Sequence, residues 1–193
     1  MENDFFVVGI DASVGDESAL YDLFANIPDQ INAAFIIARH QKRDHQSQMK
    51  FLLSRHTRYP IYLIRDGEEI KPSSVYLIPE NNTATISQGR LLLKERLLNS
   101  DQNSIDELFT SLAQDMKKRA IGIILSGSDK EGTKGADAIE EHGGIIMVQE
   151  PSSSDSGSKP SEVIVNDFPD YILPARNMGM QLSDYISSRA DKT

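Results

Sequence analysis

Short apolar runs alternate with segments of helical periodicity along the first part of the chain. The runs at residues 5–10, 33–38 and 60–64 are rich in β-branched residues and bounded by polar or turn residues, which is typical of buried strands. Apolar side chains recur at helical spacing from residue 16 onward and again around residues 49–53. This alternation predicts right-handed crossovers and a parallel sheet.

The hydrophobic pattern changes between residues 74 and 94. Three short runs separated by turns lie at 74–78, 83–87 and 90–94, and we predict an antiparallel hairpin or meander appended to the parallel sheet. The alternation then resumes. It predicts a helix that opens with a Ser104/Glu107 capping box, strands at 120–125 and 145–148, a glycine-rich loop at 126–135, a polar loop at 152–161 and a final helix at 179–187.

Composition and charge narrow the class of protein. A chain of 193 residues is expected to form one domain with a substantial core. The net charge of −9 argues against nucleic acid or an anionic membrane as a general partner. The chain has no cysteine, which excludes disulfides and thiolate chemistry. No apolar run approaches the ~20 residues that span a bilayer, and no signal peptide is evident, so we predict a cytoplasmic protein without membrane insertion.

The first strand and helix enclose the most informative residue, Ser13. A serine at a strand-to-helix turn places its hydroxyl at the carboxyl edge of the sheet, beside the free N–H groups that begin the helix. This position suits a nucleophile, and it equally suits a residue that only caps the helix. The stretch by itself leaves both interpretations open.

Two further strand ends carry polar groups that complement a serine nucleophile. His40 follows the second strand, and Asp129 and Glu131 follow a later one. Loops at the carboxyl ends of parallel strands converge, so these residues could supply a base and an orienting acid. Taken singly, the histidine is more typical of a surface residue and the carboxylates of turn residues. Their coincidence at one edge favours a site.

Cofactor and metal sites have weaker support. The loop at 127–135 lacks the G-x-x-x-x-G-K-[ST] order of a phosphate loop, and no G-x-G-x-x-G fingerprint is present. No histidine and carboxylate cluster has the spacing of metal ligands. We therefore expect no cofactor and no metal.

The order of these elements resembles the catalytic domain of the bacterial chemotaxis protein-glutamate methylesterases (CheB type) over nearly the whole chain. Individually the matching segments are weak, but their order and spacing are fairly specific. They are the Ser13 turn, Ile37 to His40, D66-G-E-E-I-K-P72 with V75-Y-L-I-P79, S104-I-D-E-L-F109 with S111-L-A113, L125-S-G127 through Glu131 to Gly135, and Gly143-Gly144 with V148-Q-E150.

The resemblance implies a three-layer α/β/α domain with a doubly wound, mostly parallel sheet. It implies hydrolysis of glutamate γ-methyl esters, or of related glutamine amides, on a methylated receptor or other protein. Carried over by position, Ser13 is the nucleophile, His40 the base and Glu131 the acid, with Asp129 as the alternative acid. The backbone N–H groups of Val14 and Ser128 are expected to form the oxyanion hole.

Several residues depart from the family pattern around this expected site. The family usually has glycine at the positions of Asp11 and Asp16, threonine at Val14, methionine at Ser128 and aspartate at Glu131. One unit charge 4 Å from an oxyanion opposes it by roughly 4 kcal/mol at an effective dielectric of ~20, so Asp11 and Asp16 bear directly on activity. The alternative function is a catalytically degenerate member that binds a partner.

Domain organisation and regulation follow from the same comparison. Family members commonly carry a receiver domain before the catalytic domain, whereas here the catalytic pattern starts at residue 5. We therefore expect one methylesterase-type domain over residues 1–193 without a receiver domain. The sequence identifies neither the particular protein substrate nor the oligomeric state.

Overall fold

A computed structural model describes residues 4–12, 17–39, 46–96, 104–125, 132–153, 164 and 169–190. Its strands are β1 Phe6–Ala12, β2 Ala33–Arg39, β3 Ile61–Leu63, β4 Glu68–Glu69, β5 Ser74–Leu77, β6 Asn82–Ser87, β7 Arg90–Glu95, β8 Ala120–Ile124, β9 Ile145–Gln149 and β10 Tyr171–Leu173. Its helices are α1 Glu17–Ala25, α2 Gln46–Leu53, α3 Ser104–Met116, α4 Thr133–Glu141 and α6 Ala175–Ala190, with short 3-10 turns η1 Lys117–Arg119 and η2 Pro151–Ser153.

Seven strands form the main sheet, in the order β10-β9-β8-β1-β2-β5-β3. Every adjacent pair in this sheet is parallel. The central strands β1 and β8 are buried along their whole length, because both of their faces are covered. The predicted parallel sheet with helical crossovers is confirmed.

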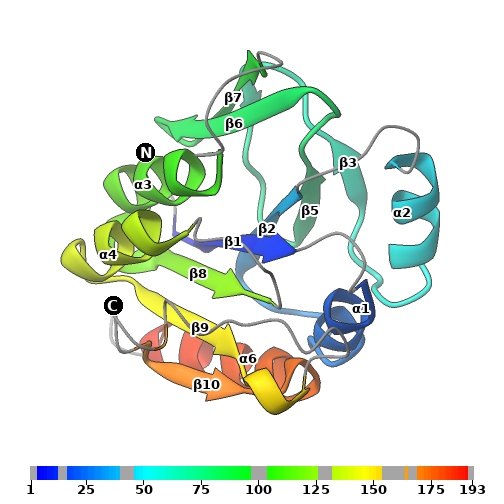
Figure 1. The fold of residues 1–193 in the computed structure, drawn as a ribbon, viewed down its shortest axis with the longest axis vertical. Coiled ribbons are helices and arrows are strands. Elements are labelled where there is room, and N and C mark those ends of the chain that lie inside the picture. Colours follow the sequence, from blue (N-terminus) through cyan, green and yellow to red (C-terminus); the bar gives the residue numbers. More distant parts are fainter. Residues whose placement is uncertain are drawn as a thin grey trace.

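Helices cover both faces of the sheet, so the domain has three layers (Figure 1). Alternate residues of β1 contribute to two separate cores: Val8 and Ile10 pack with α1, α2 and α6, whereas Val7 packs with α3 and α4. Phe109 of α3 lies directly over the centre of the sheet, where a Cβ added to Gly9 would be 2.9 Å from the Phe109 ring. The glycine in β1 therefore lets α3 approach the sheet closely.

A small antiparallel sheet, in the order β4-β7-β6, packs on the outer side of α3. The β6–β7 hairpin confirms the predicted antiparallel segment, and its turn is held by Asp115 of α3, which accepts hydrogen bonds from the backbone N–H groups of Gln88 (2.6 Å) and Gly89 (2.8 Å). The prediction was wrong for residues 74–78. β5 belongs to the main sheet, between β2 and β3. Its side chains are buried on both faces of that sheet, Val75 and Leu77 in one core and Tyr76 in the other.

Two predicted boundaries also differ from the structure. β1 continues for two residues past Ile10, since Asp11 and Ala12 still pair with β2. α6 begins at Ala175, four residues before its predicted start, because Arg176 and Asn177 of its first turn are exposed and carry no apolar signal. Within the described parts of the chain, no helix is long and apolar enough to cross a membrane.

Candidate functional site at the carboxyl edge of the sheet

The strand order contains a switch point between β1 and β8. From β1 the chain passes through α1 to β2 on one side, and from β8 it passes through α4 to β9 on the other. Because α1 and α4 cover opposite faces of the sheet, the two connections diverge. Open parallel sheets bind their ligands in the crevice at such a point, beyond the carboxyl ends of the strands.

Three neighbouring strands end at this edge in a defined register. Ala12 at the end of β1 pairs with Arg39 at the end of β2, and the N–H group of Leu125, just after β8, donates a 3.0 Å hydrogen bond to the carbonyl of Asp11. Adjacent strands lie about 4.8 Å apart, so the chain leaves β8, β1 and β2 from points within roughly 10 Å of one another.

The predicted site residues follow these three strand ends in the sequence. Ser13 and Val14 come after β1, His40 comes after β2, and Ser128, Asp129 and Glu131 come after β8. All six, and Asp16 with them, lie outside the described residues. Their roles stay predictions, and what the fold supplies is the common edge from which their segments depart.

Asp11 is one of the residues expected to depart from the family pattern, and it lies within the described residues. The first strand predicted at residues 5–10 ends before Asp11, but Asp11 is the penultimate residue of β1, paired with Ala38 on one side and Ile124 on the other. It is 9% exposed, and strand alternation places it on the same face as Val7, the face of α3 and α4. Its charge thus lies within the paired residues at the end of β1, two residues before Ser13 in the sequence.

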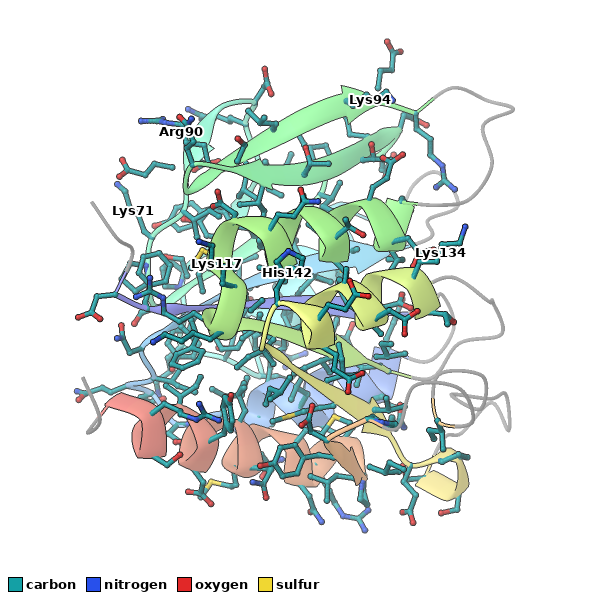
Figure 2. All side chains as sticks on the ribbon, turned by 90° about the vertical axis from the view of Figure 1, so that its left-hand side faces the viewer. Lys71, Arg90, Lys94, Lys117, Lys134 and His142 are labelled. Carbon is teal, nitrogen blue, oxygen red and sulfur yellow. The ribbon has the colours of Figure 1, made fainter. Side chains whose placement is uncertain are left out.

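Helix N-termini contribute to the electrostatics of this edge. α1 and α4 begin a few residues after the carboxyl ends of β1 and β8, and α3 starts at the same end as α4, as Lys134 near the start of α4 and Lys117 after the end of α3 indicate (Figure 2). A helix N-terminus carries about half a positive charge. The edge therefore favours negative charge that develops there.

The sequence analysis missed Asp106. Its Oδ1 atom accepts hydrogen bonds from the backbone N–H groups of Gly132 (3.0 Å) and Gly135 (2.8 Å), so the third residue of α3 caps the N-terminus of α4. The capping box at S104-I-D-E107 predicts only the local start of α3. The local pattern holds no sign of this contact, because its partners lie 26 and 29 residues away.

Gln149 shapes the same edge on the other side of β8. It ends β9, is 1% exposed, and its Nε2 atom donates to the carbonyl oxygen of Ser153 at 3.3 Å. The backbone N–H of Glu150 also donates to the carbonyl of Leu173 at the end of β10. These bonds hold the η2 turn against the carboxyl ends of β9 and β10.

A hollow of about 550 Å³ lies between the end of α2 and the start of β3, lined by Phe51, Tyr59, Pro60 and Ile61 among others. β3 begins at Ile61 and runs parallel to its neighbour, so this hollow lies toward the amino ends of the strands. It is therefore separate from the carboxyl edge. No group of three or more candidate metal ligands gathers among the residues described.

The fold defines a class: a three-layer, doubly wound α/β protein whose parallel sheet has a switch point, the place where proteins of this class bind their ligands. Residues 8–182 match the CheB methylesterase family. The chain belongs to the CheB methylesterase family, which confirms the resemblance.

Similar proteins agree with this assignment. A protein-glutamate methylesterase/protein-glutamine glutaminase of Thermotoga maritima is 25% identical over 185 residues, which cover 93% of this chain and 54% of that protein. An uncharacterised 104.1 kDa protein of Rhodobacter capsulatus is 31% identical over 141 residues, or 73% of this chain and 15% of that protein. The chain thus spans about half, or less, of the length of these relatives.

The crystal structure of the Thermotoga maritima CheB methylesterase catalytic domain has the same fold. It superposes with a TM-score of 0.82 at 24% identity and covers 94% of this chain and 99% of that domain. The predicted fold class is confirmed by this likeness and by the sheet order.

Proposed function

We propose that this chain is a serine hydrolase that cleaves glutamate γ-methyl esters on a methylated protein of the chemoreceptor type, with glutamine side-chain amides as a related substrate. The proposal rests on the family and on the names of its relatives, which are protein-glutamate methylesterases/protein-glutamine glutaminases. The observation that carries it is the common carboxyl edge of β8, β1 and β2, to which Ser13, His40 and Glu131 are joined in the sequence.

In the proposed reaction, Ser13 Oγ forms a bond to the γ-carbonyl carbon of the ester while His40 takes the hydroxyl proton. The tetrahedral intermediate expels its methoxy group, which takes the proton from His40 and leaves as methanol. A water molecule then attacks the acyl-serine with His40 again as base. The bond between Ser13 Oγ and the acyl carbon breaks, Ser13 takes the proton from His40, and the glutamate carboxylate leaves. Glu131 holds the imidazole tautomer, and the N–H groups of Val14 and Ser128 stabilise the oxyanion.

The test is methanol release from a methylated chemoreceptor cytoplasmic fragment. We expect release by the wild-type protein and none by Ser13→Ala or His40→Ala, with both variants folded. Ser87→Ala and His142→Gln are matched controls, because both side chains are exposed on other parts of the surface. Wild-type turnover in either site variant, or equal loss in its control, contradicts the proposed roles.

A second function is favoured by the five departures from the family pattern at Asp11, Val14, Asp16, Ser128 and Glu131. Together they suit a methylesterase fold that binds a protein partner without turnover. The same preparation separates the two functions. A receptor fragment that binds the wild-type protein in calorimetry but releases no methanol supports the binding function and refutes the hydrolase.

A further inference from the structure

The start of α4 is held by a neighbouring helix instead of by its own N-cap residue. Gly132 occupies the N-cap position and has no side chain to accept the free N–H groups of the first turn. Asp106 of α3 supplies that acceptor, with Oδ1 within hydrogen-bond distance of both Gly132 and Gly135.

Two features of the backbone fit this cap. Gly132 has a φ angle of +99°, in the left-handed region that favours glycine. A Cβ on Gly135 would lie 2.5 Å from Phe109 Cβ and 3.1 Å from Asp106 Cα, so α4 approaches α3 closely enough for the short aspartate side chain to reach. Figure 2 shows the two helices side by side, with α3 next to the small sheet.

The capped N–H group of Gly132 is joined by a peptide bond to Glu131, the proposed acid. The nitrogen of Gly132 belongs to the peptide unit that joins Glu131 to Gly132. A hydrogen bond from that nitrogen to Asp106 therefore holds Gly132, the residue that directly follows the proposed acid in the sequence. It also fixes the point at which the chain returns from residues 126–131 to the described fold.

We propose that Asp106 is a positioning residue for the hydrolase: by holding the Gly132 N–H group against α3, it anchors the end of the segment that carries the proposed acid, Glu131. This inference rests on the proposed function. It assigns Asp106 no contact with substrate. A mutation far from the reacting atoms that misplaces a catalytic group by about 1 Å can lower turnover about a hundredfold, so the effect of losing Asp106 is measurable.

The structure offers a matched control in the same helix. Asp115 of α3 also accepts hydrogen bonds from two backbone N–H groups, those of Gln88 and Gly89. It holds the β6–β7 turn, however, and not a segment that leads from the carboxyl edge of the main sheet. Asp115→Ala therefore removes the same kind of bond without disturbing the site.

The experiment measures kcat and KM for methanol release, together with the melting temperature, for the wild-type protein, Asp106→Ala, Asp106→Asn and Asp115→Ala. We expect kcat of Asp106→Ala to fall about a hundredfold with KM nearly unchanged, since the lost alignment acts on the chemical step. Asp106→Asn keeps an oxygen that accepts both N–H groups and recovers most of kcat. Asp115→Ala lowers the melting temperature but retains kcat.

The outcomes separate the inference from the proposed function. If wild type is active and Asp106→Ala keeps its kcat, or loses no more than Asp115→Ala, the positioning role is overturned while the hydrolase stands. If wild type releases no methanol, the hydrolase itself fails, and the positioning role falls with it. If Asp106→Ala does not fold, kcat is compared between the wild-type protein, Asp106→Asn and Asp106→Ser. Equal kcat values in these three proteins, whose side-chain oxygens differ in reach, refute the positioning role.

Discussion

Replacing Gly135 with alanine tests how closely α4 packs on α3. Gly135 is the third residue of α4, it is buried, and its φ angle is not in the left-handed region. Alanine normally stabilises such a helical position by about 1 kcal/mol relative to glycine. In an open helix, therefore, Gly135→Ala is a stabilising substitution.

Here the added methyl group has no room. It would lie 2.5 Å from Phe109 Cβ and 3.1 Å from Asp106 Cα, and both atoms are held by the backbone of α3 and cannot rotate away. Carbon atoms in ordinary contact lie about 3.5–4.0 Å apart, so the helices must separate by roughly 1 Å. Overpacking of this kind costs about 1–3 kcal/mol, and the separation also lengthens the Gly135 hydrogen bond to Asp106, which is worth about 1 kcal/mol. After the helix-propensity gain of about 1 kcal/mol is subtracted, we expect Gly135→Ala to lower the free energy of unfolding by roughly 1–3 kcal/mol.

Urea denaturation followed by far-UV circular dichroism gives this free energy directly. The difference between Asp137→Ala and Asp137→Gly, at an exposed position of the same helix, measures the propensity term separately. Subtracting it from the Gly135→Ala result isolates the cost of the overlap. Stabilisation of Gly135→Ala by the full propensity difference would refute the close packing of α3 and α4.

Two further predictions concern charge. Burial raises the pKa values of Tyr59, Tyr76 and Tyr185 above the usual 10.0. Because the unfolded chain then loses these protons at lower pH than the folded chain, the free energy of unfolding has its full value below about pH 10 and falls as the pH rises further. Urea midpoints from about pH 9 to pH 11 should show this fall, and Tyr185→Phe should make it shallower, whereas an unchanged slope contradicts the prediction. Asp11→Asn removes a carboxylate two residues before Ser13 in the sequence, and for a separation of about 7 Å at an effective dielectric of ~20 a unit charge is worth roughly 2 kcal/mol. We expect kcat for methanol release to rise up to about thirtyfold, and a lower kcat would show that the carboxylate assists the reaction.

Much of the main sheet could be predicted because its strands are short apolar runs separated by helical segments. β5 was assigned to the wrong sheet because the turns around it resemble those of a hairpin. The residues V75-Y-L-I78, which include most of β5, form a continuous apolar run that suits a strand covered on both faces. The segment N82-T-A-T-I-S87 of β6 instead alternates as a half-covered strand does. Periodicity within the segment, rather than its turns, distinguishes the two sheets.

The site could be predicted only in part, for a related reason. The ends of strands can be predicted from local sequence patterns. The sequence could therefore predict that the segments after β8, β1 and β2 leave the sheet at one edge. The contact between Asp106 and α4 joins residues of two helices and depends on two glycines that permit a close approach, Gly132 through its φ angle and Gly135 through its missing Cβ. Neither condition leaves a sign at Asp106 itself.

The fold and the chemistry of this edge depend on different residues. The register of β1 with β2 and β8 is set by apolar side chains such as Val8, Ile10 and Ile123, which are fully buried. β1 accommodates Asp11 in that register, between Ala38 and Ile124, and pairing continues to Ala12. A charge at the end of the strand is thus compatible with the complete sheet. We therefore expect Asp11 to affect the rate of the proposed reaction rather than the fold, so that a ratio of kcat values, not a melting temperature, reports its effect.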